Sequence, residues 1–112
     1  MKKIGLVLVM ASLWLAANVL AQQQGDIFEA LHCGGCHKSD VSAASPSLKE
    51  IAGAYQAKED QLVKYLKGEA GSIVWPADGN LMKRAIEKTK ALSDGDRKAL
   101  ADFIMGHGAH GE

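Results

Sequence analysis

The chain contains two cysteines, Cys33 and Cys36, and they stand two residues apart, with His37 directly after the second. Three chemistries use such a group of residues: a redox-active disulfide, a metal site, and the covalent attachment of a heme. All three need these side chains held close together by a tight turn. The rest of the sequence has to distinguish among them.

The disulfide and the metal site fit the sequence less well than the heme. A redox-active disulfide of this spacing normally opens a helix beside a sheet, and no part of the chain has the alternating apolar pattern of a strand. A zinc ion needs four ligands, usually from two separated pairs. Cys36 and His37 adjoin each other too closely to bind one ion easily, and the distant candidates, His107 and His110, lie in a glycine-rich tail. A zinc-binding exported protein is therefore kept only as an alternative.

Attachment of a heme uses every residue of the motif. Two thiols at this spacing can add to two vinyl groups of the porphyrin, which holds the following histidine where its imidazole can bind the iron. Gly34 and Gly35 let the backbone turn close to the porphyrin. We therefore predict one covalent heme c, with Cys33 and Cys36 as its thioether residues and His37 as an axial ligand of the iron.

The opposite face of the iron needs a second ligand or stays open. Outside the N-terminal segment the methionines are Met82 and Met105. Met82 falls on the apolar side of a predicted helix that follows a long glycine-containing loop, and such a loop can carry a ligand across the heme. Met105 is interpreted as a packing residue. We predict Met82 as the second axial ligand; if Met82 only packs, the open site would suit a heme enzyme or a sensor of gas or peroxide.

Helical patterns account for the remainder of the domain, so the predicted fold class is all-α, with about four to five helices around the heme. Ser47 with Glu50 forms a capping box, and Asn80 and Ser93 are predicted to cap later helices. Residues 106–112 are predicted to be a frayed tail. The expected helices are about 26–31, 48–55, 59–67, 81–90 and 93–105.

The N-terminal segment has the pattern of an export signal. Lys2 and Lys3 precede an uncharged, mostly apolar run that ends at Ala21, and the last residues of this run have side chains of small or moderate size. We predict a cleaved signal peptide over residues 1–21, a domain over residues 22–112, and a periplasmic location. The alternative is an uncleaved membrane anchor, since the apolar run approaches the length of a bilayer span.

The composition of the predicted domain limits its partners and its core. Cleavage would leave eleven basic and thirteen acidic residues, a balance that argues against nucleic acid as a partner. Large side chains are few, so an apolar cofactor would complete a small core. The aromatic residues that remain are Phe28, Tyr55, Tyr65, Trp75 and Phe103.

With these features the chain resembles single-heme class I cytochromes c of the short bacterial type, in which an extra helix carries the axial methionine. The resemblance rests on the attachment motif, the order of the helices and the final amphipathic helix. It implies close contact between the first and last helices, through Gly25, Phe28, Leu100 and Phe103. It also implies two further roles: the carbonyl of Pro46 accepts a hydrogen bond from His37, and Trp75 bonds a heme propionate. For Trp75, plain packing stays open as the alternative.

The resemblance and the predicted ligands imply an electron carrier and not an enzyme. Its expected partners are transient redox proteins, such as a membrane cytochrome complex and a terminal oxidase or reductase, and the expected state is a monomer. Basic residues are frequent in the region of the last two helices, and they form either a solvated face or a positive docking patch. They are Lys83, Arg84, Lys88, Lys90, Arg97 and Lys98.

Overall fold

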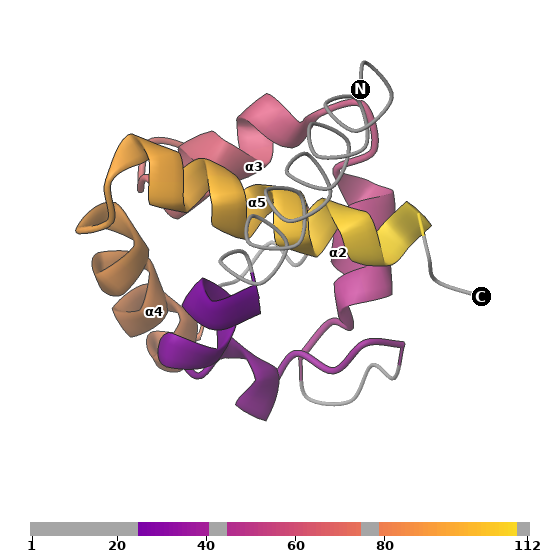
Figure 1. Cartoon of the computed structure of the whole chain (residues 1–112), viewed down its shortest axis with the longest axis horizontal. Coiled ribbons are helices and arrows are strands. Elements are labelled where there is room, and N and C mark those ends of the chain that lie inside the picture. Colours follow the sequence, from indigo (N-terminus) through magenta and orange to yellow (C-terminus); the bar gives the residue numbers. More distant parts are fainter. Residues whose placement is uncertain (1–24, 41–44, 75–78, 110–112) are drawn as a thin grey trace, which may run out of the picture.

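The computed structural model describes residues 25–40, 45–74 and 79–109, and within these ranges the regular structure is entirely helical (Figure 1). The predicted all-α fold class is confirmed. No helix in the described part of the chain has the length and apolar character needed to cross a bilayer. A helical segment over residues 25–30 is followed by η1 (Cys33–Gly35), α2 (Leu48–Ala54), α3 (Glu59–Leu66), α4 (Asn80–Lys90) and α5 (Asp94–Ala109).

Two of the helices begin where the sequence predicts, because a serine caps each of them. The Oγ atom of Ser47 accepts a hydrogen bond of 3.1 Å from the backbone N–H of Glu50 at the start of α2. Ser93 accepts the same bond, also 3.1 Å, from the N–H of Asp96 in α5. Each serine satisfies a backbone donor that the first turn of a helix leaves without an intrahelical partner.

Two predicted helix ends are wrong. Asn80 does not cap α4: it is the first helical residue, and Gly79, in extended conformation, is the N-cap without a side-chain bond. The last helix does not end near Met105 but continues to Ala109, so four residues of the tail predicted to be frayed are helical. His107 stabilises this last turn, because its ring lies 4.6 Å from the Phe103 ring and its Nδ1 atom 3.0 Å from the Phe103 carbonyl oxygen.

The core lies around α5, which packs against α2 and α3. In Figure 1, α5 runs across the middle of the molecule, with α3 above it and the N-terminal helical segment below. That segment reaches α5 through Phe28, whose ring centroid lies 4.9 Å from that of Phe103. Phe28 and Leu100 are both buried in one hydrophobic cluster. The contact between the first and last helices, which the resemblance implies, is therefore present.

The end of α3 lies close to the end of α4. Gly68 follows α3 with φ +78°, a left-handed conformation that favours glycine. A β-carbon at this position would come within 2.8 Å of the Lys90 side chain. The hydroxyl of Thr89 donates a hydrogen bond of 2.5 Å to the carbonyl of Leu66. These contacts bring the last turns of the two helices together.

Candidate heme-attachment site

The cysteines are held in one tight turn, η1, at the border of the core. The N–H of His37 donates a bond of 3.0 Å to the carbonyl oxygen of Cys33, which closes the turn over the two glycines. Cys33 is half-buried and packs against the hydrophobic core, whereas Cys36 is exposed. A group attached through both sulfur atoms would therefore have one edge toward the core and one edge toward solvent.

The environment of Cys33 does not suit a redox-active dithiol. Burial raises the pKa of its thiol, and the nearby positive charge of Lys88 opposes this change without overcoming it. Redox-active cysteines in this spacing have a lowered pKa, because the thiolate is their reactive form. Neither Cys33 nor Cys36 takes part in a disulfide. The structure thus gives no support to the thiol–disulfide alternative.

His37 is oriented by a hydrogen bond to the residue that the resemblance names. Its Nδ1 atom lies 2.8 Å from the carbonyl oxygen of Pro46. A carbonyl can only accept, so Nδ1 carries a proton, and in the neutral imidazole the lone pair is then on Nε2. This is the tautomer that binds a metal through Nε2, and the same bond makes the imidazole a stronger ligand.

The space beside His37 is accessible. An open cleft of about 320 Å³ adjoins His37 and Gly34 and has Phe28 and Leu48 in its wall. His107 lines the same cleft. However, no three His, Cys, Asp or Glu side chains within the described ranges lie close enough together to hold a metal ion. The ligand set of the zinc alternative is therefore not assembled in this part of the chain.

The two candidate methionines have different surroundings. Met105 is half-buried and packs against the hydrophobic core, in agreement with its interpretation as a packing residue. Met82 is half-buried in the first turn of α4, beside Leu81, which is 72% exposed. The core contact described for α4 is made by Ile86, one turn further along. Ligation by Met82 stays a prediction, and Trp75, the predicted propionate contact, lies outside the described residues.

Two of the basic residues predicted to form a docking patch are engaged within the chain, and one of them is buried. Arg97 is only 3% exposed and binds backbone carbonyls of its own chain, so its place in the patch is wrong. Lys98 forms ion pairs with Glu59, at 2.7 Å, and with Asp102. Sequence reasoning also missed Lys38, whose Nζ atom donates a bond of 2.9 Å to the carbonyl of Gly34, four residues earlier.

Comparison with known protein families agrees with this site. The family model for Cytochrome c matches residues 25–108, so the chain belongs to the cytochrome c family, and these residues form one class I cytochrome c domain. Its cofactor is heme c, bound covalently through the cysteine pair. Proteins of this family typically carry electrons and are not enzymes. No curated protein is similar enough in sequence to count as a match.

The residues of the site fit this cofactor on three observations. The thiols of Cys33 and Cys36 are free, and they straddle the border between core and solvent. The hydrogen bond to Pro46 leaves Nε2 of His37 as the available donor atom. The two glycines of the turn add no side-chain atoms beside it, and no heavy atom approaches the position of a Gly35 β-carbon within 4 Å.

Proposed function

We propose that this protein is an exported, periplasmic electron carrier whose heme iron is bound by His37 and Met82. The bond between His37 and Pro46 carries the proposal, because it orients the half-buried imidazole and prepares it as a ligand. When bound, heme c supplies an iron that alternates between the ferric and ferrous states, and so accepts and releases one electron.

The two axial side chains would determine the affinity of the heme for electrons and the access of small molecules to the iron. The imidazole of His37 is a strong donor that its carbonyl partner holds in one orientation. The thioether of Met82 would be a soft ligand that favours the ferrous state and so raises the reduction potential. With both side chains bound, the iron would have no open position, which would exclude small molecules and favour electron transfer over enzyme chemistry.

The packing around His37 would keep this ligand in place as the electron moves. Pro46 and Ser47 lie at the start of α2, are buried, and are fixed by the capping bond to Glu50. Helix α2 in turn packs along α5. A rigid, water-poor ligand environment changes little between the two charge states, which keeps electron transfer fast.

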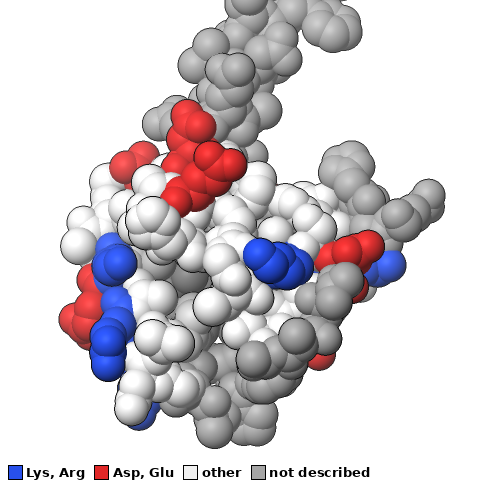
Figure 2. Space-filling view, turned by 90° about the horizontal axis from the view of Figure 1, so that it is seen from below, with Lys and Arg blue, Asp and Glu red and all other residues white. Residues whose placement is uncertain are grey.

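A basic patch near the attachment motif is the proposed docking surface for acidic redox partners. Lys38 binds the motif directly through Gly34, and the charge of Lys88 acts on the Cys33 thiol, which it can do only from nearby. On the face seen in Figure 2, basic side chains lie at the left edge, the side of α4, with acidic atoms beside them, and a larger acidic group lies near the top. The proposed members of the patch are four exposed residues, Lys38, Lys83, Arg84 and Lys88. Lys90 and Lys98 are also exposed, but each forms an ion pair with a carboxylate of its own chain.

Such a patch suits transient binding. At moderate salt, the attraction between exposed charges extends over about 10 Å, so it guides a partner to the patch. Because this attraction is weak, the partner is also released readily. Partners of this kind include a membrane cytochrome complex on the donor side and a terminal oxidase or reductase on the acceptor side. We expect the protein to be a monomer, in which the patch is free to bind either partner.

Carbon monoxide tests the proposed function in a single experiment. The purified ferrous protein is mixed with the gas, and its absorption spectrum is followed. Because both axial positions are occupied in a carrier, the spectrum of the native protein should stay unchanged at neutral pH. Rapid formation of a carbon monoxide adduct would instead show an open site, and the protein would then be a heme enzyme or sensor. The mass of the same sample also reports export: cleavage after Ala21 gives a chain that begins at Gln22.

A further inference from the structure

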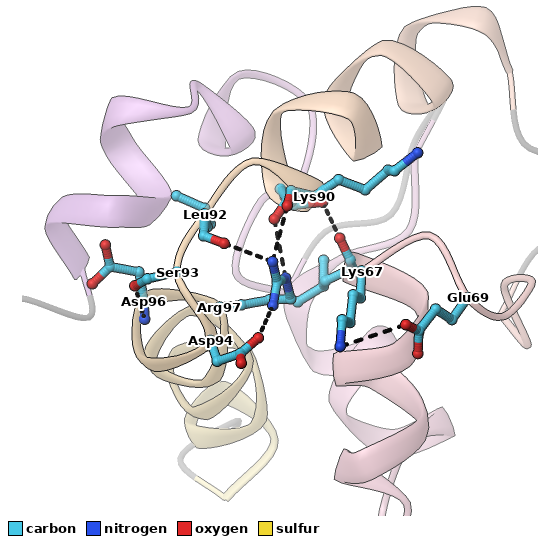
Figure 3. Close-up of polar contacts among 10 residues, drawn as sticks. Lys67, Glu69, Lys90, Leu92, Ser93, Asp94, Asp96 and Arg97 are labelled. Carbon is cyan, nitrogen blue, oxygen red and sulfur yellow. Dashed lines mark hydrogen bonds and ion pairs between the residues drawn. The ribbon is translucent and has the colours of Figure 1, made fainter.

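Arg97 is a charged residue whose side chain is buried in the fold. In the sequence it lies far from the attachment motif. The residue is 3% exposed and projects from α5 toward the end of α4 (Figure 3). Its Nε atom donates a bond of 3.1 Å to the carbonyl of Thr89, and its Nη2 atom donates to the carbonyls of Lys90, at 2.9 Å, and Leu92, at 2.6 Å. Nη1 forms an ion pair of 2.7 Å with Asp94.

These bonds give α4 its C-terminal cap. The last carbonyls of a helix have no intrahelical donor and often obtain one from a following glycine in left-handed conformation. Neither Ala91 nor Leu92, the residues after α4, has a positive φ, so that device is absent here. The N–H groups of these two residues donate to the carbonyls of Lys88 and Thr89. The guanidinium of Arg97 adds donors to the carbonyls at this end, and its positive charge is also favourable at the negative end of the helix dipole.

The other contacts described for α4 lie in its C-terminal half, where Ile86 also packs against the core. Thr89 is the buried residue of this helix, and its hydroxyl bonds the carbonyl of Leu66. The Lys90 stem lies against Gly68. At the opposite end, Gly79 provides no side-chain cap and Leu81 is largely exposed. Within the described residues, α4 is therefore held through its C-terminal half, by Ile86 and by the bonds of its last turn.

Met82 stands at the weakly held end. It precedes Thr89 by seven residues, or about two helical turns and about 10 Å. A tilt of about 10° around the held end would displace Met82 by about 2 Å, comparable to the length of a bond to a metal. We infer that Arg97 is a positioning residue: it fixes the direction of α4 and thereby keeps the Met82 thioether within reach of the iron. This inference rests on the proposed function.

The experiment compares the heme-loaded native protein with the Arg97→Gln and Arg97→Lys variants. The glutamine variant removes the charge and most of the donors, while lysine keeps the charge but lacks the planar fork that reaches several carbonyls. Two quantities are measured in the ferric protein: the temperature at which the long-wavelength band of thioether–iron bonding is lost, and the rate at which cyanide binds. Both report the Met82 bond and are compared with the temperature of global unfolding.

For Arg97→Gln we expect the band to disappear at least about 10 °C below global unfolding, and cyanide to bind about tenfold faster at room temperature, since a bond to a charged group is lost. Arg97→Lys should lie between this variant and the native protein. The control is Ala52→Gly in α2, which lowers the unfolding temperature through helix propensity without touching α4. In that variant the band should persist until the protein unfolds.

Two results contradict the account, and they differ. If the native protein lacks the thioether band, the proposed ligation by Met82 fails. If the native protein has the band, but both Arg97 variants lose it only on global unfolding and bind cyanide no faster than Ala52→Gly, then Arg97 is only a structural residue and the inference fails. Should Arg97→Gln not accumulate in the cell, Arg97→Lys alone decides between these outcomes.

Discussion

The Nδ1 atom of His37 lies 2.8 Å from the carbonyl oxygen of Pro46, and Pro46 immediately precedes Ser47, the N-cap of α2. The orientation of the imidazole is thus connected to the start of a helix that begins at Leu48, eleven residues after His37. A helix cap in this protein has two consequences: it stabilises α2, and it holds the acceptor of the ligand histidine.

The two serine caps separate these consequences. Ser47→Ala and Ser93→Ala each remove one capping bond of 3.1 Å, so each should lower the free energy of unfolding by about 1 kcal/mol. Only Ser47→Ala should also change the reduction potential, because only Ser47 adjoins the acceptor of His37. Denaturant unfolding and redox titration measure the two effects. Equal potentials in both variants would contradict the connection.

Removal of the histidine ligand should change the spectrum without releasing the cofactor. In His37→Ala the thioether bonds to the cysteines remain, but the iron loses a strong nitrogen ligand, so the absorption spectrum should become high-spin. His107→Ala is the matched control, since His107 lines the same cleft but bonds the carbonyl of Phe103. Its spectrum should equal that of the native protein. A spectrum that changes only in the His107→Ala control would show that His107, and not His37, is the ligand, and would contradict the account.

Reversal of one charge in the basic patch should slow partner association. Lys88→Glu places a negative charge near the attachment motif, and we expect association with an acidic redox partner to slow by about threefold at low salt and to become less dependent on salt. Stopped-flow kinetics at several ionic strengths measure this. The control is Lys58→Glu, an equal change of charge at the exposed start of α3. If both variants slow the reaction equally, only net charge matters.

Two glycines should respond to alanine in opposite directions. Gly68 has φ +78°, and an added β-carbon would meet the Lys90 side chain at 2.8 Å, so Gly68→Ala should cost about 1–3 kcal/mol of stability. Gly53 lies within α2, with no heavy atom within 4 Å of the new β-carbon. Gly53→Ala should therefore stabilise the protein by about 0.5–1 kcal/mol. Thermal unfolding of both variants tests the backbone assignment, and a stabilised Gly68→Ala would contradict it.

Features that depend on residues near one another in sequence could be predicted. The tight turn of the motif follows from the spacing of Cys33 and Cys36, and the start of α2 follows from Ser47 with Glu50. Both are decided by hydrogen bonds within a few residues. The contact of Phe28 with Phe103 came from the family resemblance, since helical periodicity marks an apolar face but does not choose its partner.

Features that depend on distant parts of the chain could not be predicted. Arg97 stands among other basic residues, and nothing in its local pattern distinguishes a buried cap from a solvated charge; its acceptors in α4 and the following turn become available only when the helices fold together. Likewise, α5 continues through Gly106 although glycine has a low helix propensity, because the ring of His107 packs on Phe103. Tertiary contacts decided both cases.

Ligation of the iron by Met82 is the central claim that remains to be measured, and the absorption spectrum of the ferric protein tests it most directly. The native protein and the Met105→Ala variant should both show the weak long-wavelength band of thioether–iron bonding, because Met105 packs against the core. Met82→Ala should lack this band while it retains the covalent heme by mass. A band that survives in Met82→Ala and disappears in Met105→Ala would contradict the account.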